Sequence, residues 1–400
     1  MQARNKKTDG TFKFFLVSRA ARSIGMIFVT LALPLYLFAL HYDLISIGVI
    51  YLIVMSFNVV LMLVLGAFGD RFGYKKALIL GDVFPLAAFM MLAASTNITV
   101  VLTAAVMGGV AGVAGGLRGT FSPGSTALIV SNWKDEKERV SRLGKVASTG
   151  SAFAIAGALM LSAHGVISRY TGNIGGFRIL FAVSALFVFV SLVSLFFVEE
   201  VRRPKKSTRI MKWTSVRYSF KIIASNVVNG FGIGMALPLL PLWFTLLYGV
   251  NTGVIGVVYT LSYASTAIAA YMASREAYSS RISALVTASY TRILQGATLL
   301  LIAFSPLFLL AGAIFIFRSF VAGFGSPSRS MMNLRGINNE DYGTASSVMG
   351  VANRLSQTSS GLSGYLMDVS LPAPVFIGGA AQLIGGILYF KLLSGKKAKN

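Results

Sequence analysis

The chain contains no cysteine, which excludes disulfide bonds, thiol catalysis and thiolate metal sites. It has only two histidines, His41 and His164, and both fall near expected loops, so no histidine metal site is expected either. Charged residues make up 12% of its 400 residues, about half the share of a typical soluble domain. The composition therefore argues against a soluble domain and against a metalloprotein.

What the chain has instead is hydrophobic sequence, 55% of all residues, in runs of roughly 20 that short polar stretches separate. This pattern is typical of an all-α polytopic membrane protein. The 41 glycines agree with it, because small residues let membrane helices pack closely. The first run is too long for a signal-peptide core, so we expect a retained first helix. We expect twelve transmembrane helices, at 14–39, 44–66, 77–95, 98–121, 143–165, 177–198, 219–247, 253–273, 282–305, 307–328, 343–367 and 373–393.

Basic residues outnumber acidic ones by 36 to 13, a net charge of +23, and they gather in alternate loops. Lysine and arginine occur in both termini, in the central linker and in the loops after the second, fourth, eighth and tenth expected helices. The opposite loops carry only Arg169 and Arg178. The positive-inside rule therefore places both termini and the linker in the cytoplasm. Because this topological role accounts for the charge, nucleic-acid binding is not expected.

The central linker, 199–218, divides the chain into expected six-helix bundles at 1–198 and 219–400. A shift of 204 residues relates the two halves and predicts an internal repeat. The shift pairs "ALP" at 32–34 with "ALP" at 236–238, Arg71 with Arg275, Tyr74 with Tyr278, "SP" at 122–123 with "SP" at 326–327, and Glu136 with Glu340.

The segment after the second expected helix, 66–76, reads "GAFGDRFGYKK". It resembles the helix 2–3 loop signature of the major facilitator superfamily, G-x-x-x-D-R-x-G-x-K/R-K/R, and the resemblance covers essentially the whole chain. The general pattern is closest to the drug-exporter-like branch, although the fifth helix lacks the glycine-proline motif of its exporting antiporters. We call the following residues the latch motif: Gly66, Gly69, Asp70, Arg71, Gly73, Lys75 and Lys76.

The latch motif combines a turn with a carboxylate. Gly66 and Gly73 permit a tight turn and a close backbone approach, and Asp70 is placed to meet the partial positive charge of a helix N-terminus. The resemblance implies that this N-terminus belongs to the eleventh helix, near 342–347, and that the motif favours one access state. The alternative is a topogenic basic loop with a turn. The second-half copy, "AYMASREAYSS" at 270–280, has Ser274 in place of the acid.

Charges inside the membrane are functional candidates because each costs about 3 kcal/mol on insertion scales. The resemblance implies that helices 1, 4, 7 and 10 line a central cavity and that helices 3, 6, 9 and 12 lie outside. Arg19 is expected near the cytoplasmic interface, and Arg292, on helix 9, is expected to pair with a neighbour or to snorkel. The substrate-binding candidates are Arg22, Arg118, Arg318, Arg354, Asn226, Asn229, Tyr259, Tyr263 and Gln357. For each arginine, the alternative is a packing or gate contact to backbone carbonyls.

Asp82 is the only acidic residue inside an expected span. It is the candidate for proton coupling, and the alternative is an interfacial ion pair with Lys75 or Lys76. An exporter of cations usually needs a carboxylate at mid-membrane, whereas this chain has arginines there. Guanidinium groups hold carboxylate or phosphate groups with two hydrogen bonds, so the arginines favour an anionic or polyhydroxylated substrate.

The sequence predicts a secondary active transporter of a small organic solute that works by alternating access, with export or exchange of an anionic or amphiphilic compound favoured. One alternative is an uptake symporter for a sugar, organic acid or phosphate ester. An alternative of another class is a non-transporting receptor or a lipid-moving protein. An enzyme is not expected, because no acid–base or nucleophile–base pair converges at one depth. We expect no cofactor, a monomer in the plasma membrane, and as partners the substrate, lipid, and a coupling proton or exchanged anion.

Overall fold

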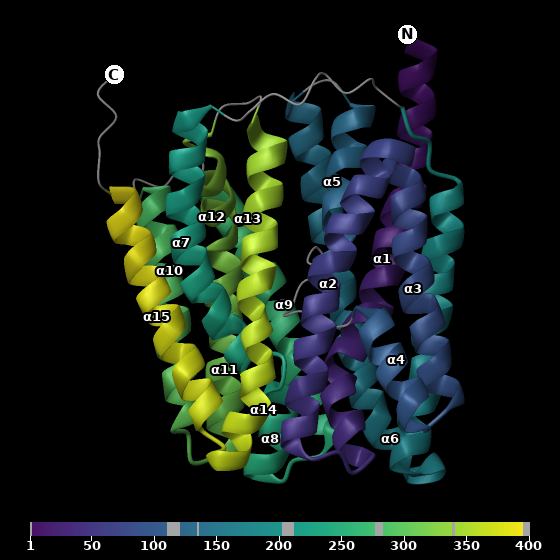
Figure 1. The fold of residues 1–400 in the computed structure, drawn as a ribbon, viewed down its shortest axis with the longest axis vertical. Helices are drawn as coiled ribbons and strands as arrows, with labels where there is room; N and C mark the ends of the chain where they lie inside the picture. The colour runs from purple at the N-terminus through teal and green to yellow at the C-terminus, as the bar shows by residue number, and fades with distance from the viewer. Residues whose placement is uncertain are drawn as a thin grey trace. The chain divides into compact units, whose positions relative to one another are not determined.

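The computed structural model describes residues 2–109, 121–133, 136–201, 212–276, 283–337 and 341–394, and it is helical throughout with no strand among these residues (Figure 1). The chain divides into two compact units. The first comprises 1–43, 53–207 and 251–260, and the second comprises 44–52, 208–250 and 261–400. The expected bundles at 1–198 and 219–400 stay a prediction, because the first unit also includes 251–260 and the second also includes 44–52.

The first unit is built around two long helices that pack against each other. They are α1 (Gln2–Ala39) and α6 (Glu136–Phe196), and α3 (Tyr74–Ala94) also packs on α6. The remaining helices of this unit are α4 (Ile98–Gly108), α5 (Phe121–Asn132) and the larger part of α2 (Leu44–Phe72). The fourth expected helix ends at 121, whereas the structure has a further helix, α5, from Phe121 to Asn132.

The helix α6 contains a turn at Gly172, whose backbone φ of 75° and ψ of 165° are not helical. The imidazole of His164 stacks on the ring of Phe177 with centroids 3.8 Å apart, and its Nε2 lies 3.0 Å from the carbonyl oxygen of Asn173. In a straight helix, residues 13 positions apart would be separated by about 20 Å. The chain therefore folds back at Gly172, as expected from the separate helices predicted at 143–165 and 177–198.

The second unit contains α7 (Trp213–Ala236), α8 (Leu240–Tyr248) and most of α9 (Thr252–Glu276). Helices α7 and α8 form one expected span that is bent by 43° at the break between them. The "ALP" repeat behaves differently in the two units, because Pro34 lies inside the continuous α1 while the helix breaks around Pro238. A second proline, Pro241, follows in the first turn of α8.

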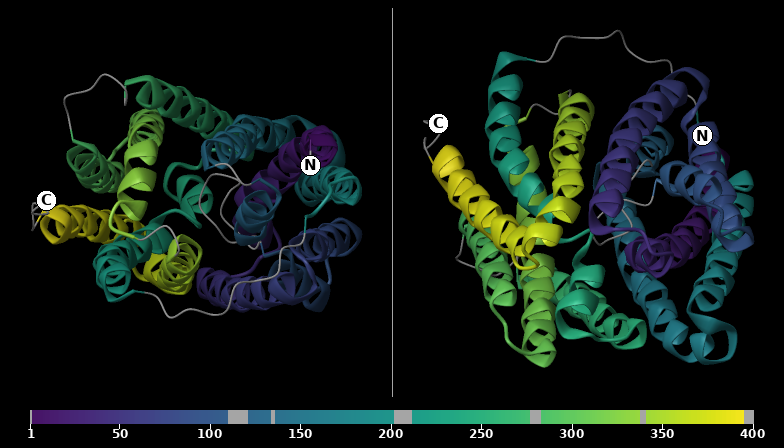
Figure 2. Two further views of the ribbon diagram at one scale, coloured as in Figure 1. Left: turned by 90° about the horizontal axis from the view of Figure 1, so that it is seen from above. Right: turned by 60° about the horizontal axis from the view of Figure 1, so that its bottom comes forward.

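The other helices of the second unit are α10 (Ala284–Ala303), α11 (Phe308–Phe324), α12 (Ser326–Leu334), α13 (Tyr342–Ser356), α14 (Ser360–Val369) and α15 (Ala373–Ser394). Helix α15 packs along both α7 and α10 (Figure 2). A 3₁₀ turn, Gln357–Ser359, interrupts the eleventh expected span between α13 and α14. It lies against Gly234 of α7, where a Cβ atom would be 2.5 Å from the carbonyl oxygen of Gln357.

Eight helices among the described residues are long and apolar enough to cross a membrane, or nine if the bent pair α7–α8 is one span. This number is lower than the twelve spans expected from the sequence, for structural reasons. The helix α6 counts once although it contains the turn at Gly172, α13 and α14 are separated by the 3₁₀ turn, and the span expected at 98–121 runs into 110–120, outside the described residues.

Glycines join α2 to α14 within the second unit. A Cβ atom on Gly48 would lie 2.6 Å from the carbonyl oxygen of Gly361 and 3.0 Å from the Cα of Gly364, and one on Gly364 would overlap the carbonyl oxygen of Leu44. The backbones therefore approach at a distance that no larger residue permits.

We expect Gly364→Ala to lower stability by about 1–3 kcal/mol, because the added methyl group meets backbone atoms that cannot rotate away. The measurement is thermal unfolding of the purified protein in detergent. The matched control is Gly350→Ala in α13, where the added Cβ would meet no atom within 4 Å. Equal melting temperatures for the two variants would contradict the close packing.

Candidate functional site

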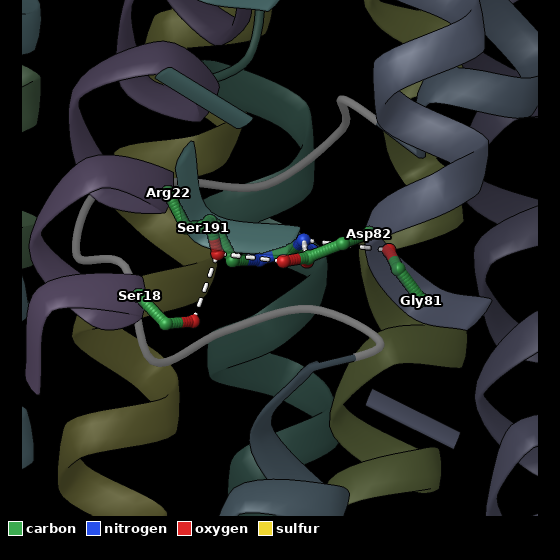
Figure 3. A network of polar contacts seen from close by, with 5 residues as sticks. All are labelled: Ser18, Arg22, Gly81, Asp82 and Ser191. Carbon is green, nitrogen blue, oxygen red and sulfur yellow. Dashed lines mark hydrogen bonds and ion pairs between the residues drawn. The ribbon is translucent and has the colours of Figure 1, made fainter. Parts of the chain in front are cut away.

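A buried ion pair joins two helices of the first unit (Figure 3). Arg22 of α1 donates from Nη1 to the Oδ1 of Asp82 in α3, and the same nitrogen lies 3.3 Å from the carbonyl oxygen of Gly81. The side chain of Asp82 is completely buried, and that of Arg22 is 4% exposed. The structure therefore brings together the arginine candidate of the first helix and the proton-coupling candidate of the third.

Two serine hydroxyls extend this ion pair toward α6. Ser191 donates from Oγ to the Oδ2 of Asp82 at 2.6 Å, and the Oγ of Ser18 lies 2.8 Å from the Oγ of Ser191. Both serines are fully buried. Ser18 and Arg22 are four residues apart on α1, so they share one helix face. Arg22 contacts Asp82 directly, and Ser18 contacts Ser191, the serine that donates to Asp82. Figure 3 shows this chain of contacts running from α1 through Ser191 to Asp82.

Arg19 belongs to the same region, although the sequence analysis placed it near the cytoplasmic interface. Its side chain is 1% exposed, and its charge acts on both Arg22 and Asp82. The guanidinium group lies against Gly150 of α6, where a Cβ atom would be 2.7 Å from Nε. Glycine at 150 therefore makes room for a second buried cation beside one carboxylate, and this function of Gly150 was not visible in the sequence.

The pairing of Asp82 corrects the alternative interpretation of this residue. Lys75 or Lys76 was the expected ion-pair partner, but Asp82 pairs with Arg22, and the Nζ of Lys75 donates to the carbonyl oxygen of Phe196 at 2.7 Å. Lys75 lies about 10 Å along the helix axis from Asp82, since each residue rises 1.5 Å. The third helix therefore turns its carboxylate inward and its lysines toward the helix end.

The second unit has a related polar cluster on corresponding helices. Arg292 of α10 donates from Nη2 to the Oδ1 of Asn226 in α7 at 2.8 Å, and its Cζ lies 4.0 Å over the ring of Tyr389 in α15. Arg292 is the ninth residue of α10, as Asp82 is the ninth of α3. Asn226 follows Arg22 by the 204 residues of the predicted repeat. By the same shift Asp82 corresponds to Val286, so Arg292 does not take the place of the carboxylate. Arg292 is 6% exposed and pairs with its neighbour Asn226, so it does not snorkel.

Arg318 is the arginine candidate of the tenth expected helix, and it lies on α11. Its Nη2 donates to the Oε1 of Gln382 in α15 at 2.9 Å, and both residues are buried. The Nε2 of Gln382 has no hydrogen-bond partner among the described residues. Gln382 was not singled out from the sequence, although an amide in the apolar run "GGAAQLIGG" is a signal that could have found it.

The other substrate-binding candidates lie on several different elements. Arg354 and Gln357 are buried at the end of α13 and in the 3₁₀ turn, and Tyr259 and Tyr263 are buried on α9. The backbone of Asn229 packs against Gly385, where a Cβ atom would be 2.9 Å from the amide nitrogen. Arg118 lies outside the described residues, as do Tyr278 and Glu340.

The latch motif forms the turn between α2 and α3. Gly73 has a φ of 109°, which a side chain would oppose. The hydroxyl of Tyr74 donates to the Oδ1 of Asp70 at 2.7 Å. Gly69 packs under the Tyr74 ring, where a Cβ atom would be 2.8 Å from Cδ1, whereas one on Gly66 would meet no atom within 4 Å. The turn therefore depends on Gly73 and the close approach on Gly69, and the close approach expected at Gly66 is not found among the described residues.

Glu200, at the end of the first unit's described chain, was not identified from the sequence. Its two carboxylate oxygens accept the backbone N–H groups of Tyr74, at 2.7 Å, and Lys75, at 3.1 Å. The first turn of a helix leaves such N–H groups without partners and attracts negative charge. The N-terminus nearest the latch motif, that of α3, is thus occupied by Glu200. The partner predicted for Asp70, near 342–347, includes residues whose side chains are not described.

Comparison with known proteins identifies the family. The family model described as Major Facilitator Superfamily matches residues 15–358. A solved structure described as "Structural insights into substrate recognition in proton dependent oligopeptide transporters" aligns with a TM-score of 0.71 and 12% identity, covering 96% of this chain and 99% of that one. An identity this low shows the fold alone. No curated protein matches the chain. Its family-model match, its all-helical polytopic fold and its latch motif show that the chain belongs to the Major Facilitator Superfamily of secondary transporters.

Proposed function

We propose that this transporter moves a small organic anion, by export or exchange, through alternating access in the plasma membrane, as a monomer with both termini in the cytoplasm. The observation that carries the substrate class is an excess of buried positive charge. The buried arginines of the described residues are Arg19, Arg22, Arg292, Arg318 and Arg354, and the buried carboxylates there are those of Asp82 and Asp341. Asp341 lies at a helix end, where it accepts the backbone N–H of Lys212 at 3.2 Å.

Buried charges of one sign are costly unless an opposite charge joins them. A carboxylate or phosphate group of a substrate would provide that charge for part of the transport cycle. Arg318 is suited to this function because its buried guanidinium group is held in place by the amide of Gln382. An amphiphilic anion would in addition bury its apolar part among the hydrophobic residues of the helices.

Uptake by proton symport is the second candidate, and the pairing of Arg22 with Asp82 favours it. An anionic substrate that takes hydrogen bonds from Arg22 would release Asp82, and a buried carboxylate without its cation binds a proton more readily. Proton and anion would then occupy the transporter in the same state and cross together. Export by antiport would instead require that the proton and the anion compete for binding, so that only one of them occupies the transporter at a time.

A thermal-shift screen followed by counterflow tests the proposal. The purified protein is melted with gluconate, benzoate and glycerol phosphate, with tetraphenylphosphonium as a cation and with glucose as a neutral solute. We expect stabilisation by at least one anion and then counterflow of that anion in liposomes. Stabilisation by the cation but by no anion would overturn the substrate class, and binding without counterflow would favour the receptor alternative. A proton flux that accompanies the anion would favour uptake.

The latch motif provides a second test. We expect Asp70→Asn to lower the rate of counterflow about tenfold without reducing membrane insertion, because a neutral amide interacts weakly with a helix N-terminus. The matched control is Tyr74→Phe, which removes the hydroxyl that donates to Asp70 but keeps the carboxylate. Unchanged counterflow in Asp70→Asn, at equal amounts of inserted protein, would leave only the topogenic interpretation of this loop.

A further inference from the structure

The hydroxyl of Ser191 differs from those of its neighbours on α6. Ser184 and Ser194 donate to the carbonyl oxygens of Leu180 and Val190, four residues earlier on their own helix, at 2.8 Å and 2.7 Å. This is the usual arrangement for a serine inside a helix. Ser191 instead donates to the Oδ2 of Asp82, on another helix. Its hydroxyl is therefore directed toward the one buried carboxylate of this unit's polar network.

The two serine hydroxyls form a chain with a fixed direction. A hydroxyl has one hydrogen to donate and two lone pairs. Since the hydrogen of Ser191 is directed to Asp82, the contact of 2.8 Å between the two Oγ atoms requires Ser18 to be the donor. The donors therefore run from Ser18 to Ser191 to the carboxylate while Asp82 is ionised. If Asp82 is protonated, both hydrogen bonds can reverse.

We propose that Ser18 and Ser191 form a proton relay to Asp82. The inference rests on the second candidate function, proton symport, in which Asp82 exchanges a proton during transport. A hydronium ion that reaches Ser18 in one access state gives a proton to the Oγ of Ser18. The hydroxyl proton of Ser18 passes to Ser191, and that of Ser191 passes to Oδ2. Two O–H bonds break and re-form at the serines, Asp82 becomes a neutral acid, and a neutral water molecule remains.

The relay reaches the carboxylate oxygen that does not hold the cation. Arg22 occupies Oδ1 while Ser191 occupies Oδ2, so the proton can arrive without displacing the guanidinium group first. The charged groups that act on Asp82 are Arg22 and Arg19, both from α1. The described residues of α4 and α5 contain no charged side chain. Ser18 lies one turn of α1 nearer the N-terminus than Arg22, so the relay leads toward the end of α1 that we place in the cytoplasm.

Infrared spectroscopy after a pH jump tests the relay without any substrate. The C=O stretch of a protonated, buried carboxyl group reports Asp82, and its loss in Asp82→Asn assigns the band. We expect Ser18→Ala to slow the appearance of this band about tenfold, a size typical of a lost proton-transfer group. Its amplitude and its midpoint pH should stay unchanged, because Ser18 does not touch the carboxylate. If Ser18 were only structural, its removal would not slow the appearance of the band while leaving the midpoint pH unchanged.

Variants at Ser191 and its neighbours complete the test. Ser191→Ala should slow the band and also change its midpoint pH, since Asp82 loses a direct hydrogen bond, and Ser191→Thr should restore both. Ser184→Ala and Ser194→Ala are the matched controls on α6 and should leave the rate unchanged. An unchanged rate in both Ser18→Ala and Ser191→Ala would overturn the relay, and so would equal slowing in the controls.

The relay and the proposed function can fail separately. If Asp82 shows the expected infrared kinetics but Asp82→Asn carries anion and proton as before, the relay stands and coupling at Asp82 is wrong. If Asp82→Asn abolishes transport while Ser18→Ala exchanges its proton at the normal rate, coupling stands and the relay is wrong. Absence of the Asp82 band at every pH overturns both.

Discussion

Replacing Asp82 with asparagine is expected to destabilise the protein by about 3–5 kcal/mol, the usual cost of removing one partner from a buried ion pair. The reason is that Arg22 would remain buried without the carboxylate with which it pairs. Transport should fall about a hundredfold or more, because asparagine cannot take up a proton. Thermal unfolding in detergent and counterflow in liposomes measure the two effects separately.

A double variant separates packing from chemistry in this pair. Arg22→Gln combined with Asp82→Asn removes both charges while keeping side chains of similar size. We expect it to recover most of the stability lost in the single variants, since pairs that share an interaction are not additive. Transport should not recover. Restored transport in this neutral double variant would show that the ion pair only holds α1 to α3 and takes no part in coupling.

The second large effect is expected at Arg318. If its guanidinium group binds the substrate anion, Arg318→Gln should weaken binding of the stabilising anion roughly a hundredfold, and Arg318→Lys should recover only part of it, since an ammonium group cannot form the two-pronged hydrogen bond. The measurement is the dependence of the melting temperature on anion concentration. It yields an affinity for each variant independently of flux.

Arg292 supplies the matched control for Arg318. Both are buried arginines of the second unit, and each donates to a side-chain amide oxygen, Arg292 to Asn226 at 2.8 Å and Arg318 to Gln382 at 2.9 Å. Arg292 also lies over the ring of Tyr389 and is expected outside the cavity. Arg292→Gln should therefore lower stability but leave the anion affinity unchanged. Equal loss of affinity in both variants would mean that the arginines act through the fold and not through the site.

Several features of the site were open to prediction because they are local. Asp82 is the only acid inside an expected span, which sufficed to single it out, and Arg22 and Arg318 were found as charges in apolar runs. Their partners were not. Asp82 and Arg22 are 60 residues apart in the chain. Lys75 looked like a nearer partner, but the pairing depends on which face each helix turns toward the other.

The breaks within helices also show that the sequence predicts local features but not contacts between distant segments. The turn at Gly172 was expected, because a polar stretch with glycine separates two apolar runs. The 3₁₀ turn at Gln357–Ser359 was not expected, since the hydropathy is continuous across it. Its cause is tertiary: Gly234 of α7 leaves room for the backbone of this turn. A hydropathy profile records how apolar a segment is, but not which backbone lies against it.

The sequence by itself determined the class of protein and the approximate spans, and it predicts the topology and the latch motif. Each follows from hydrophobicity, charge or glycine at positions close in the chain, and these act on a segment without regard to its neighbours. Only the tertiary structure decided that Arg22 and Ser191 hold Asp82, that Gly150 makes room for Arg19, and that Glu200 occupies the N-terminus of α3. These contacts join residues far apart in the chain, and side chains meet only where the packing of helix faces brings them within hydrogen-bonding distance.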